Sequence, residues 1–232
     1  MELKELQTIA KEHGLDVTDK MLEQFDQYAK LLIEWNERMN LTAICEYDKI
    51  IEKHFYDSIM CLFQEDIRGS VCDVGSGAGF PSLPMKIVRP DLEIIIVEPL
   101  QKRCLFLRTL VEALDLDNVK IINERAEDHA KKARESYDVV CARAVANMSL
   151  LSELCIPLVK KDGLFVALKG SDGYNELEKA KNALSKLGVE LYSSYEDKLL
   201  DGSMRINFYF KKVKHTPMMY PRAFAKIKKQ PL

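Results

Sequence analysis

From residue 69 onward, short runs of consecutive apolar residues alternate with longer segments of helical periodicity. We expect strands at residues 70–74, 92–97, 119–122, 137–142, 163–168, 189–195 and 205–213. Helices are predicted between them at residues 80–88, 102–114, 148–159 and 175–187. Continuous rather than alternating apolar strands are typical of a parallel sheet covered on both faces. The turn Asp201-Gly202 between the last two strands predicts a hairpin, and therefore one antiparallel strand.

The first 66 residues contain no such strand pattern and are predicted to be helical. Over residues 18–39 the apolar side chains recur every three or four positions, which places them on one face of a helix. In a second predicted helix, residues 47–63, His54 and Asp57 stand one turn apart, and we interpret them as an ordinary surface pair. We therefore expect three parts in the chain: an N-terminal helical extension (1–66), a core (67–213) and a C-terminal tail (214–232).

The segment VCDVGSGAGFPSLP joins the first predicted strand to a helix through a glycine-rich turn. Gly75, Gly77 and Gly79 can take positive φ and let the backbone approach a ligand, and Asp73 precedes them. A dinucleotide site would place a third glycine where Phe80 stands, and a phosphate-binding P-loop would need a following Gly-Lys-Ser/Thr. The pattern D-x-G-x-G-x-G is instead that of S-adenosylmethionine (SAM) sites. We predict a SAM-dependent methyltransferase core of class I, with a Rossmann-like, mostly parallel seven-stranded sheet.

Polar residues at the ends of the other strands are expected to complete this site, because ligands bind at the carboxyl ends of parallel strands. Glu98 ends the second strand and could accept hydrogen bonds from both ribose hydroxyls. Ala126 and Glu127 follow the third strand and could contact adenine. Arg143 ends the fourth strand, where the transferred methyl group should point, and could position the substrate.

The residues around the fourth strand also narrow the chemistry. The segment CARAVAN lacks the Asn-Pro-Pro-aromatic turn that commonly accompanies methylation of an exocyclic amine. Neither Cys141 nor Cys155 follows a proline or threonine, as a nucleophile for pyrimidine C5 methylation usually does. A substrate atom with a free lone pair, such as guanine N7, would need only correct placement.

Composition and charge add a basic C-terminus to this prediction. Residues 211–232 contain seven Lys or Arg and no acid, whereas the rest of the chain carries 27 basic and 36 acidic side chains. This asymmetry indicates a local contact with a polyanion. The cysteines and histidines show no metal-ligand spacing, and no apolar run is long enough for a bilayer, so we expect no metal, no membrane contact and a cytoplasmic protein.

Over nearly the whole chain the sequence resembles the RsmG family, also called GidB or glucose-inhibited division protein B. The shared motifs include the glycine-loop segment with its two prolines, HFYDS at 54–58, RAE at 125–127, RA at 143–144, LKG at 168–170 and the YPR of the tail. Ser82 departs from the family, which usually has Gly there, and the departure concerns the start of the helix. The resemblance implies a SAM-dependent methyltransferase acting on a guanine N7 of 16S ribosomal RNA.

The resemblance also implies site residues, partners and a mode of action. It places cofactor contacts at Gly75, Phe80, Ala126, Glu127 and Arg143. The partner would be 16S rRNA or the 30S subunit, and we expect a monomer. The residues predicted to contact RNA are Lys169, Arg222, Lys226, Lys228 and Lys229, of which the last four belong to a tail draped over the surface, with Tyr220 and Phe224 available for stacking on bases.

Two alternatives remain open at the level of sequence. A methyltransferase acting on a small molecule or a protein would make the basic tail irrelevant to substrate binding. A SAM-binding ribosome-assembly factor would bind the cofactor without transferring a methyl group to any subunit. The first alternative would place the new methyl group on a substrate other than rRNA. The second would produce no new methyl group on any subunit.

Overall fold

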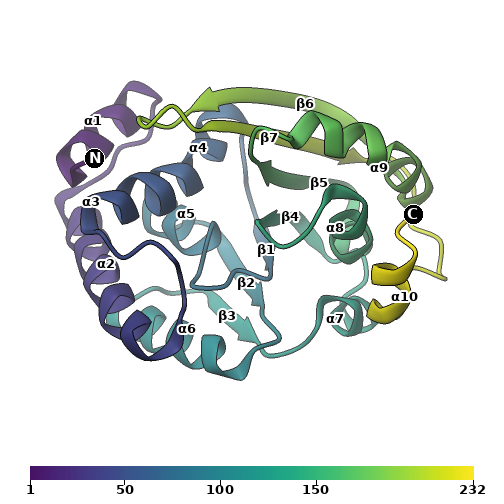
Figure 1. Ribbon diagram of the computed structural model, residues 1–232, viewed down its shortest axis with the longest axis horizontal. Coiled ribbons are helices and arrows are strands. Elements are labelled where there is room, and N and C mark those ends of the chain that lie inside the picture. The colour runs from purple at the N-terminus through teal and green to yellow at the C-terminus, as the bar shows by residue number, and fades with distance from the viewer.

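The computed structural model describes all 232 residues and is built on one mixed sheet of seven strands (Figure 1). The strand order is β3-β2-β1-β4-β5-β7-β6, and β7 alone runs in the direction opposite to the other six strands. The predicted α/β architecture with one antiparallel strand is confirmed. The strands are β1 (Ser70–Val74), β2 (Glu93–Val97), β3 (Val119–Ile122), β4 (Tyr137–Arg143), β5 (Val159–Lys169), β6 (Val189–Lys198) and β7 (Met204–Lys212).

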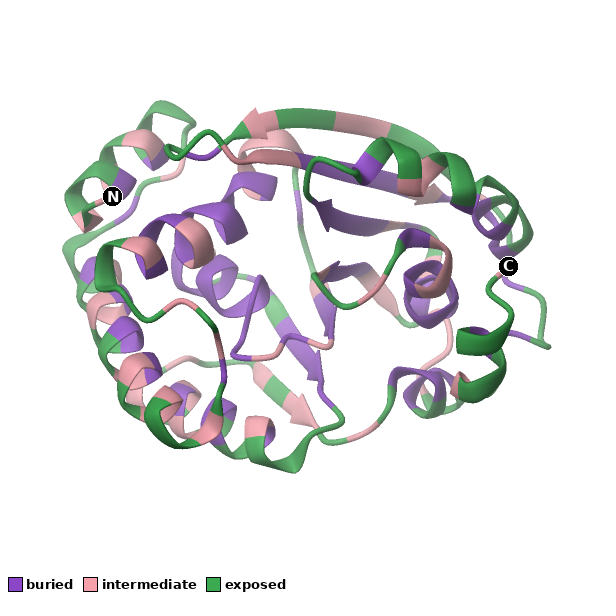
Figure 2. Cartoon of the chain, viewed as in Figure 1, coloured by how far each residue is buried: buried purple, intermediate pink, exposed green.

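Helices cover both faces of the sheet because successive strand residues point to opposite sides. On β2, Ile94 and Ile96 belong to one hydrophobic cluster, and Ile95 and Val97 belong to the other. Figure 2 shows the buried residues gathered on the strands and on the helix faces that meet them. The first cluster contains residues of α1 (Leu3–Glu12), α2 (Asp19–Met39), α4 (Asp57–Gln64), α5 (Ser82–Val88) and α6 (Gln101–Ala113); the second contains residues of α7 (Ala126–Lys132), α8 (Met148–Cys155), α9 (Gly173–Leu187) and α10 (Phe224–Lys229).

The N-terminal helices pack directly on the sheet. The helix predicted over residues 18–39 is α2, and the Thr18 side chain accepts a hydrogen bond from Met21 N at its start. The second predicted helix is an unbroken helical segment, but its hydrogen-bond pattern changes along its length. It consists of α3 (Tyr47–Ile50), a π-helix η1 (Ile51–Tyr56) and α4. The division of the chain into extension, core and tail stays a prediction, since extension and core share one hydrophobic cluster.

Two boundaries differ from the predicted ones. The helix predicted to reach residue 159 ends at Cys155 and continues as one 3-10 turn, η2 (Ile156–Leu158), because Pro157 cannot supply an N–H to an α-helix. The strand predicted to start at Gly163 already begins at Val159, and an irregularity in its pairing with β4 accommodates the turn residues. The short helices α7 and α10 were not predicted.

The C-terminal tail is folded back onto the body of the protein. The backbone N–H groups of Val213 and Lys214 both donate to Gly188 O, and Thr216 Oγ1 donates to Leu187 O at 2.7 Å. Beyond them, Ile227 of α10 is fully buried in the second cluster. Pro217 and Pro221 precede α10 and Pro231 follows it, so the tail that was predicted to drape over the surface contains a short helix.

Gly188 provides a test of this attachment. Its φ is +88°, and a Cβ would lie 2.5 Å from Lys214 O, whereas Gly202 has φ +82° and nothing within 4 Å of the Cβ position. We expect Gly202→Ala to lower the free energy of unfolding by about 1–2 kcal/mol, the cost of a left-handed alanine. Gly188→Ala should cost more, because the backbone at Lys214 must also move. Urea denaturation measures both, and equal losses would contradict this description of the tail attachment.

Candidate active site

The glycine loop follows β1 and lies beside the end of β2. Gly75 N donates to Val97 O at 2.9 Å, and Gly77 N donates to Glu98 Oε2 at 3.2 Å. Gly75 has φ +72°, and a Cβ there would lie 3.0 Å from the side chain of Val145, in the loop after β4. The loop is therefore held by backbone contacts at the point where the strand order reverses, which is where α/β sheets bind ligands.

Asp73 lies under this loop and is fully buried. Its Oδ2 accepts hydrogen bonds from Ser82 N at 3.2 Å and Ser82 Oγ at 2.6 Å, so the residue that departs from the family pattern stabilises the start of α5. Burial raises the pKa of Asp73 to about 7. Asp73 Oδ1 and Ser76 Oγ are buried without a hydrogen-bond partner, which fits a site whose polar ligand supplies the missing contacts.

A cavity of about 690 Å³, here called the glycine-loop cavity, opens above this loop. Glu98 in its wall is buried, and its Oε1 accepts a hydrogen bond from Leu100 N at 2.9 Å. The volume suits a ligand of nucleoside size. Its lining includes Gly75, Glu98, Arg103, Arg125, Ala144 and Val145.

Of the residues predicted to contact the cofactor, only Gly75 and Glu98 line this cavity themselves. Ala126 and Glu127 are buried at the start of α7, directly after Arg125 in the cavity wall. Phe80 does not line the cavity, and its ring instead stacks on Tyr28 with centroids 5.4 Å apart. Gly79 has no room for a side chain, because a Cβ would lie 2.6 Å from Tyr28 Oη. We keep cofactor contact as a prediction for all these residues.

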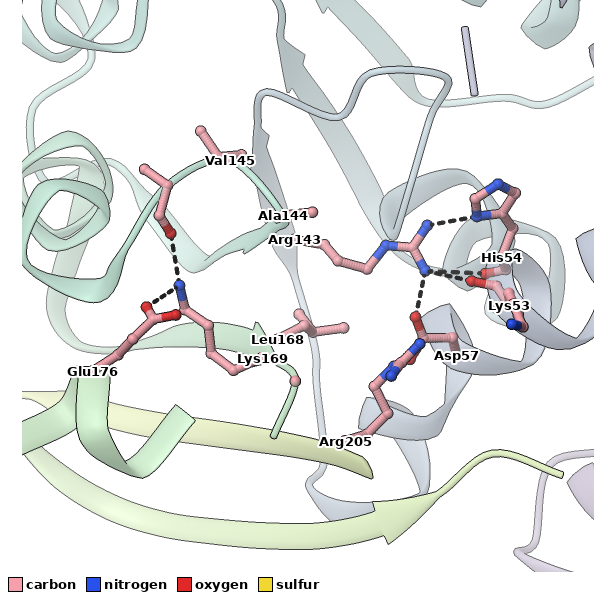
Figure 3. Close-up of a pocket in the computed structure, with 12 residues that line it drawn as sticks. Lys53, His54, Asp57, Arg143, Ala144, Val145, Leu168, Lys169, Glu176 and Arg205 are labelled. Carbon is pink, nitrogen blue, oxygen red and sulfur yellow. Dashed lines mark hydrogen bonds and ion pairs between the residues drawn. The ribbon is translucent and has the colours of Figure 1, made fainter. Parts of the chain in front are cut away.

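A second cavity of about 480 Å³, here called the arginine cavity, is lined in part by the loop after β4 (Figure 3). Ala144 and Val145 of this loop line both cavities. The two cavities therefore adjoin each other at this loop. The arginine cavity is lined by four cationic side chains, Lys53, Arg143, Lys169 and Arg205, and two carboxylates, Asp57 and Glu176.

Arg143, which the sequence placed at this strand end, is held from several sides. Its Nη1 donates to Asp57 Oδ2 at 2.9 Å and to Lys53 O at 3.3 Å, and its Nη2 contacts His54 Nδ1 at 3.3 Å. The guanidinium carbon also lies 4.9 Å from the centre of the Phe80 ring. Phe80, predicted as a cofactor contact, thus supports Arg143 in this structure.

The π-helix η1 explains why backbone oxygens are available to Arg143. In a π-helix each N–H donates five residues back, and the N–H of Asp57 accordingly donates to Glu52 O. An α-helix would pair that N–H with Lys53 O instead. The extra residue in the turn therefore presents Lys53 O and His54 toward the arginine.

Asp57 joins Arg143 to a residue of the last hairpin. Its Oδ1 accepts a hydrogen bond from Arg205 Nε at 2.6 Å, and Asp57 itself is buried. The interpretation of His54 and Asp57 as a surface pair was wrong, because both turn inward and share Arg143 as a partner. Arg205 and Lys53 were missed, since no local pattern connects β7 with the N-terminal helices.

Lys169 has a structural contact that the sequence did not reveal. Its Nζ donates to Ala146 O and to Glu176 Oε2, each at 2.7 Å, and Glu176 Oε2 also accepts from Met148 N. The lysine is buried and fixes the loop at which the two cavities adjoin. Lys169 also lines the arginine cavity, so its contact with RNA stays a prediction.

The tail contains both internal and free cations. Arg222 forms a two-point ion pair with the buried Glu153, with Nε–Oε1 and Nη2–Oε2 distances of 2.8 and 2.6 Å, and Tyr220 is buried. Both residues therefore stabilise the folded tail, and contact of Arg222 with RNA stays a prediction. Phe224 lies 5.3 Å from the guanidinium carbon of Arg125. The exposed cations of α10 are Lys226, Lys228 and Lys229.

No group of three or more His, Cys, Asp or Glu side chains is arranged to hold a metal ion. No helix combines the length and the apolar composition needed to cross a bilayer.

Comparison with known proteins assigns the family. The family model described as GidB, rRNA small subunit methyltransferase G, matches residues 21–199. Ribosomal RNA small subunit methyltransferase G of Bacillus subtilis strain 168 is 47% identical, covering 100% of this chain and 99% of its own. The protein of the same name from Lysinibacillus sphaericus strain C3-41 is 50% identical, with 91% of each chain covered.

The fold is also found in solved structures of distant sequence. TYW2 of M. jannaschii, solved in complex with AdoMet, has a TM-score of 0.58 at 16% identity, and the match covers 74% of this chain and 80% of its own. The B. subtilis protein YcgJ has a TM-score of 0.55 at 13% identity, covering 69% of this chain and 100% of its own. Together with the two cavities, the family match leads to one assignment: the chain belongs to the GidB family of small-subunit rRNA methyltransferases.

Proposed function

We propose that this protein transfers a methyl group from SAM to N7 of a guanine in 16S rRNA. The observation that carries the proposal is that Ala144 and Val145 line both the glycine-loop cavity and the arginine cavity. Methyl transfer needs a donor and an acceptor placed in line across a short distance. Two cavities that adjoin at one loop provide such an arrangement.

The glycine-loop cavity fits the cofactor. SAM supplies an electrophilic methyl group on a sulfonium. Glu98 would bind the ribose hydroxyls with its carboxylate, and the unpartnered Asp73 Oδ1 would accept a hydrogen bond from the ammonium group. Gly75 and Gly77 would let the backbone approach the ligand closely.

The arginine cavity fits a polyanionic substrate. Arg143 and Arg205 share the single carboxylate of Asp57, so this group of three carries a net positive charge. Guanidinium groups bind phosphate oxygens and guanine edges through paired N–H donors. We propose that Arg143 positions the target guanosine and that 16S rRNA or the 30S subunit is the partner.

The side chains around the arginine cavity suit an acceptor atom that needs no activation. Burial raises the pKa of the Cys141 and Cys155 thiols, so neither is a ready nucleophile. Burial, together with the charge of Arg143, lowers the pKa of His54 to about 3. Because guanine N7 already has a free lone pair, placement is the contribution that the protein makes.

We further propose that the protein acts in the cytoplasm as a monomer, with α10 contributing to the RNA contact. Lys226, Lys228 and Lys229 are exposed, and the Phe224–Arg125 contact connects α10 to the rim of the glycine-loop cavity. Clustered exposed lysines attract phosphates without reading sequence.

The cofactor proposal is tested by two charge-removing variants in one cavity. Glu98→Gln should weaken SAM binding about ten- to a hundredfold, because a hydrogen bond to a charged acceptor contributes about 1.5–3 kcal/mol. Asp128→Asn removes an exposed carboxylate from the same lining, one that pairs with Lys131, and should change the affinity less than twofold. Titration calorimetry measures both, and equal affinities for the two variants would contradict the role of Glu98.

The reaction is tested in a strain that lacks this protein. The wild-type gene should restore chain cleavage at N7-methylguanine in its 16S rRNA. Arg143→Ala should lower the methylation rate by about tenfold or more, since misplacement of a reacting group costs up to about a hundredfold. Arg68→Ala, which removes an exposed arginine outside both cavities, is the control. Failure of the wild-type gene to restore the cleavage would refute the proposed function.

The tail proposal is tested by salt dependence. Replacing Lys226, Lys228 and Lys229 by alanine should flatten the log–log slope of 30S binding against salt by up to about two to three units. The control replaces Lys179, Lys181 and Lys186, three exposed lysines of α9, and so removes the same charge. SAM affinity should be unchanged in both. Equal slopes for the two triple variants would show that α10 does not touch phosphate.

A further inference from the structure

A chain of hydrogen bonds runs from helix α2 to Arg143. Asn36 Nδ2 donates to Thr42 O and Thr42 N donates to Asn36 Oδ1, both at 2.9 Å. Thr42 Oγ1 lies 2.8 Å from His54 Nε2, and His54 Nδ1 lies 3.3 Å from Arg143 Nη2. Asn36, Thr42 and His54 therefore act together on the guanidinium group of Arg143.

The two hydrogen-bond partners of the His54 ring, Arg143 and Thr42, determine which ring nitrogen carries the proton. A guanidinium group only donates hydrogen bonds, so His54 Nδ1 must be the acceptor and carry no proton. The imidazole is then neutral with its proton on Nε2, from where it donates to Thr42 Oγ1. The threonine hydroxyl can accept this bond in addition to the one from Ile44 N at 3.1 Å, because it has two lone pairs.

The surroundings of His54 favour the same state. Its ring stacks on Phe80 with centroids 4.4 Å apart and planes 16° apart, which fixes the direction of both ring nitrogens. A proton on Nδ1 would place an N–H against the guanidinium of Arg143 and would add a second positive charge beside it. Both nitrogens are thus engaged in holding neighbours and are not free to exchange protons with a substrate.

Arg143 needs this second contact to keep one orientation. The bonds from its Nη1 to Asp57 and to Lys53 O hold only one corner of the guanidinium, and Asp57 is shared with Arg205. The bond from Nη2 to His54 fixes a second point of the planar group (Figure 3). Two points and the Phe80 ring define the plane in which the remaining N–H donors face the arginine cavity.

We propose that His54 is a positioning residue: a neutral imidazole, protonated on Nε2, that fixes the plane of Arg143 for the target guanosine. The effect of His54 on the reaction, through the placement of the target guanosine, rests on the proposed function. Its structural content, the tautomer and the contact with Arg143, is independent of the substrate.

A matched pair of variants tests the contact. His54→Asn keeps an acceptor oxygen near the position of Nδ1, whereas His54→Gln carries its amide toward the position of Nε2 and gives Arg143 no partner. We expect kcat/KM for 30S methylation within threefold of wild type for His54→Asn and at least tenfold lower for His54→Gln. SAM affinity should be unchanged in both, because His54 does not line the glycine-loop cavity. Equal rates for the two variants, or the reverse order, would overturn the proposal.

The tautomer is tested without substrate by nitrogen NMR of the histidine rings at pH 7. The His54 signals, identified by their loss in His54→Asn, should show an unprotonated Nδ1 and a protonated Nε2. A cationic ring or a proton on Nδ1 would overturn the proposal even if the variants behaved as expected. If the wild-type protein methylated no rRNA, the proposed function would fail, while the NMR result would still decide the state of His54.

Discussion

One buried carboxylate, Asp57, connects the parts of the molecule that form the arginine cavity. It lies at the start of α4 in the N-terminal region and pairs with Arg143 at the end of β4 and with Arg205 in β7. Removing one partner from a buried ion pair leaves an uncompensated charge, which is strongly unfavourable. The N-terminal helices and the last strand are therefore tied to the centre of the sheet through charge as well as through apolar packing.

The two cavities differ in their buried charged groups. The buried carboxylate of Glu98 lines the glycine-loop cavity, whereas in the arginine cavity two guanidinium groups share the carboxylate of Asp57. The loop of Ala144 and Val145 that lines both is fixed by the Lys169–Glu176 pair. The two cavities thus adjoin at a loop that the buried Lys169 keeps in place, which is the arrangement that the proposed methyl transfer needs.

The sequence predicted those features that depend on local pattern. Apolar runs gave the seven strands, and the glycine spacing with Glu98 gave the cavity at their carboxyl ends. His54 and Asp57 were misjudged because an i, i+3 spacing indicates neighbours, whereas a π-helix that turns both toward Arg143 leaves no recognisable pattern. Arg222 appeared to be a free cation because its partner, Glu153, lies 69 residues earlier in the chain.

The central claim is that the donor in one cavity meets a guanine N7 in the other. The most direct measurement uses the purified protein, SAM with a carbon-13 methyl group, and 30S subunits from a strain that lacks the protein. After digestion to nucleosides, mass spectrometry should find the label in 7-methylguanosine from 16S rRNA and in no other nucleoside. Absence of label in the rRNA, or label in a different nucleoside, would contradict the account.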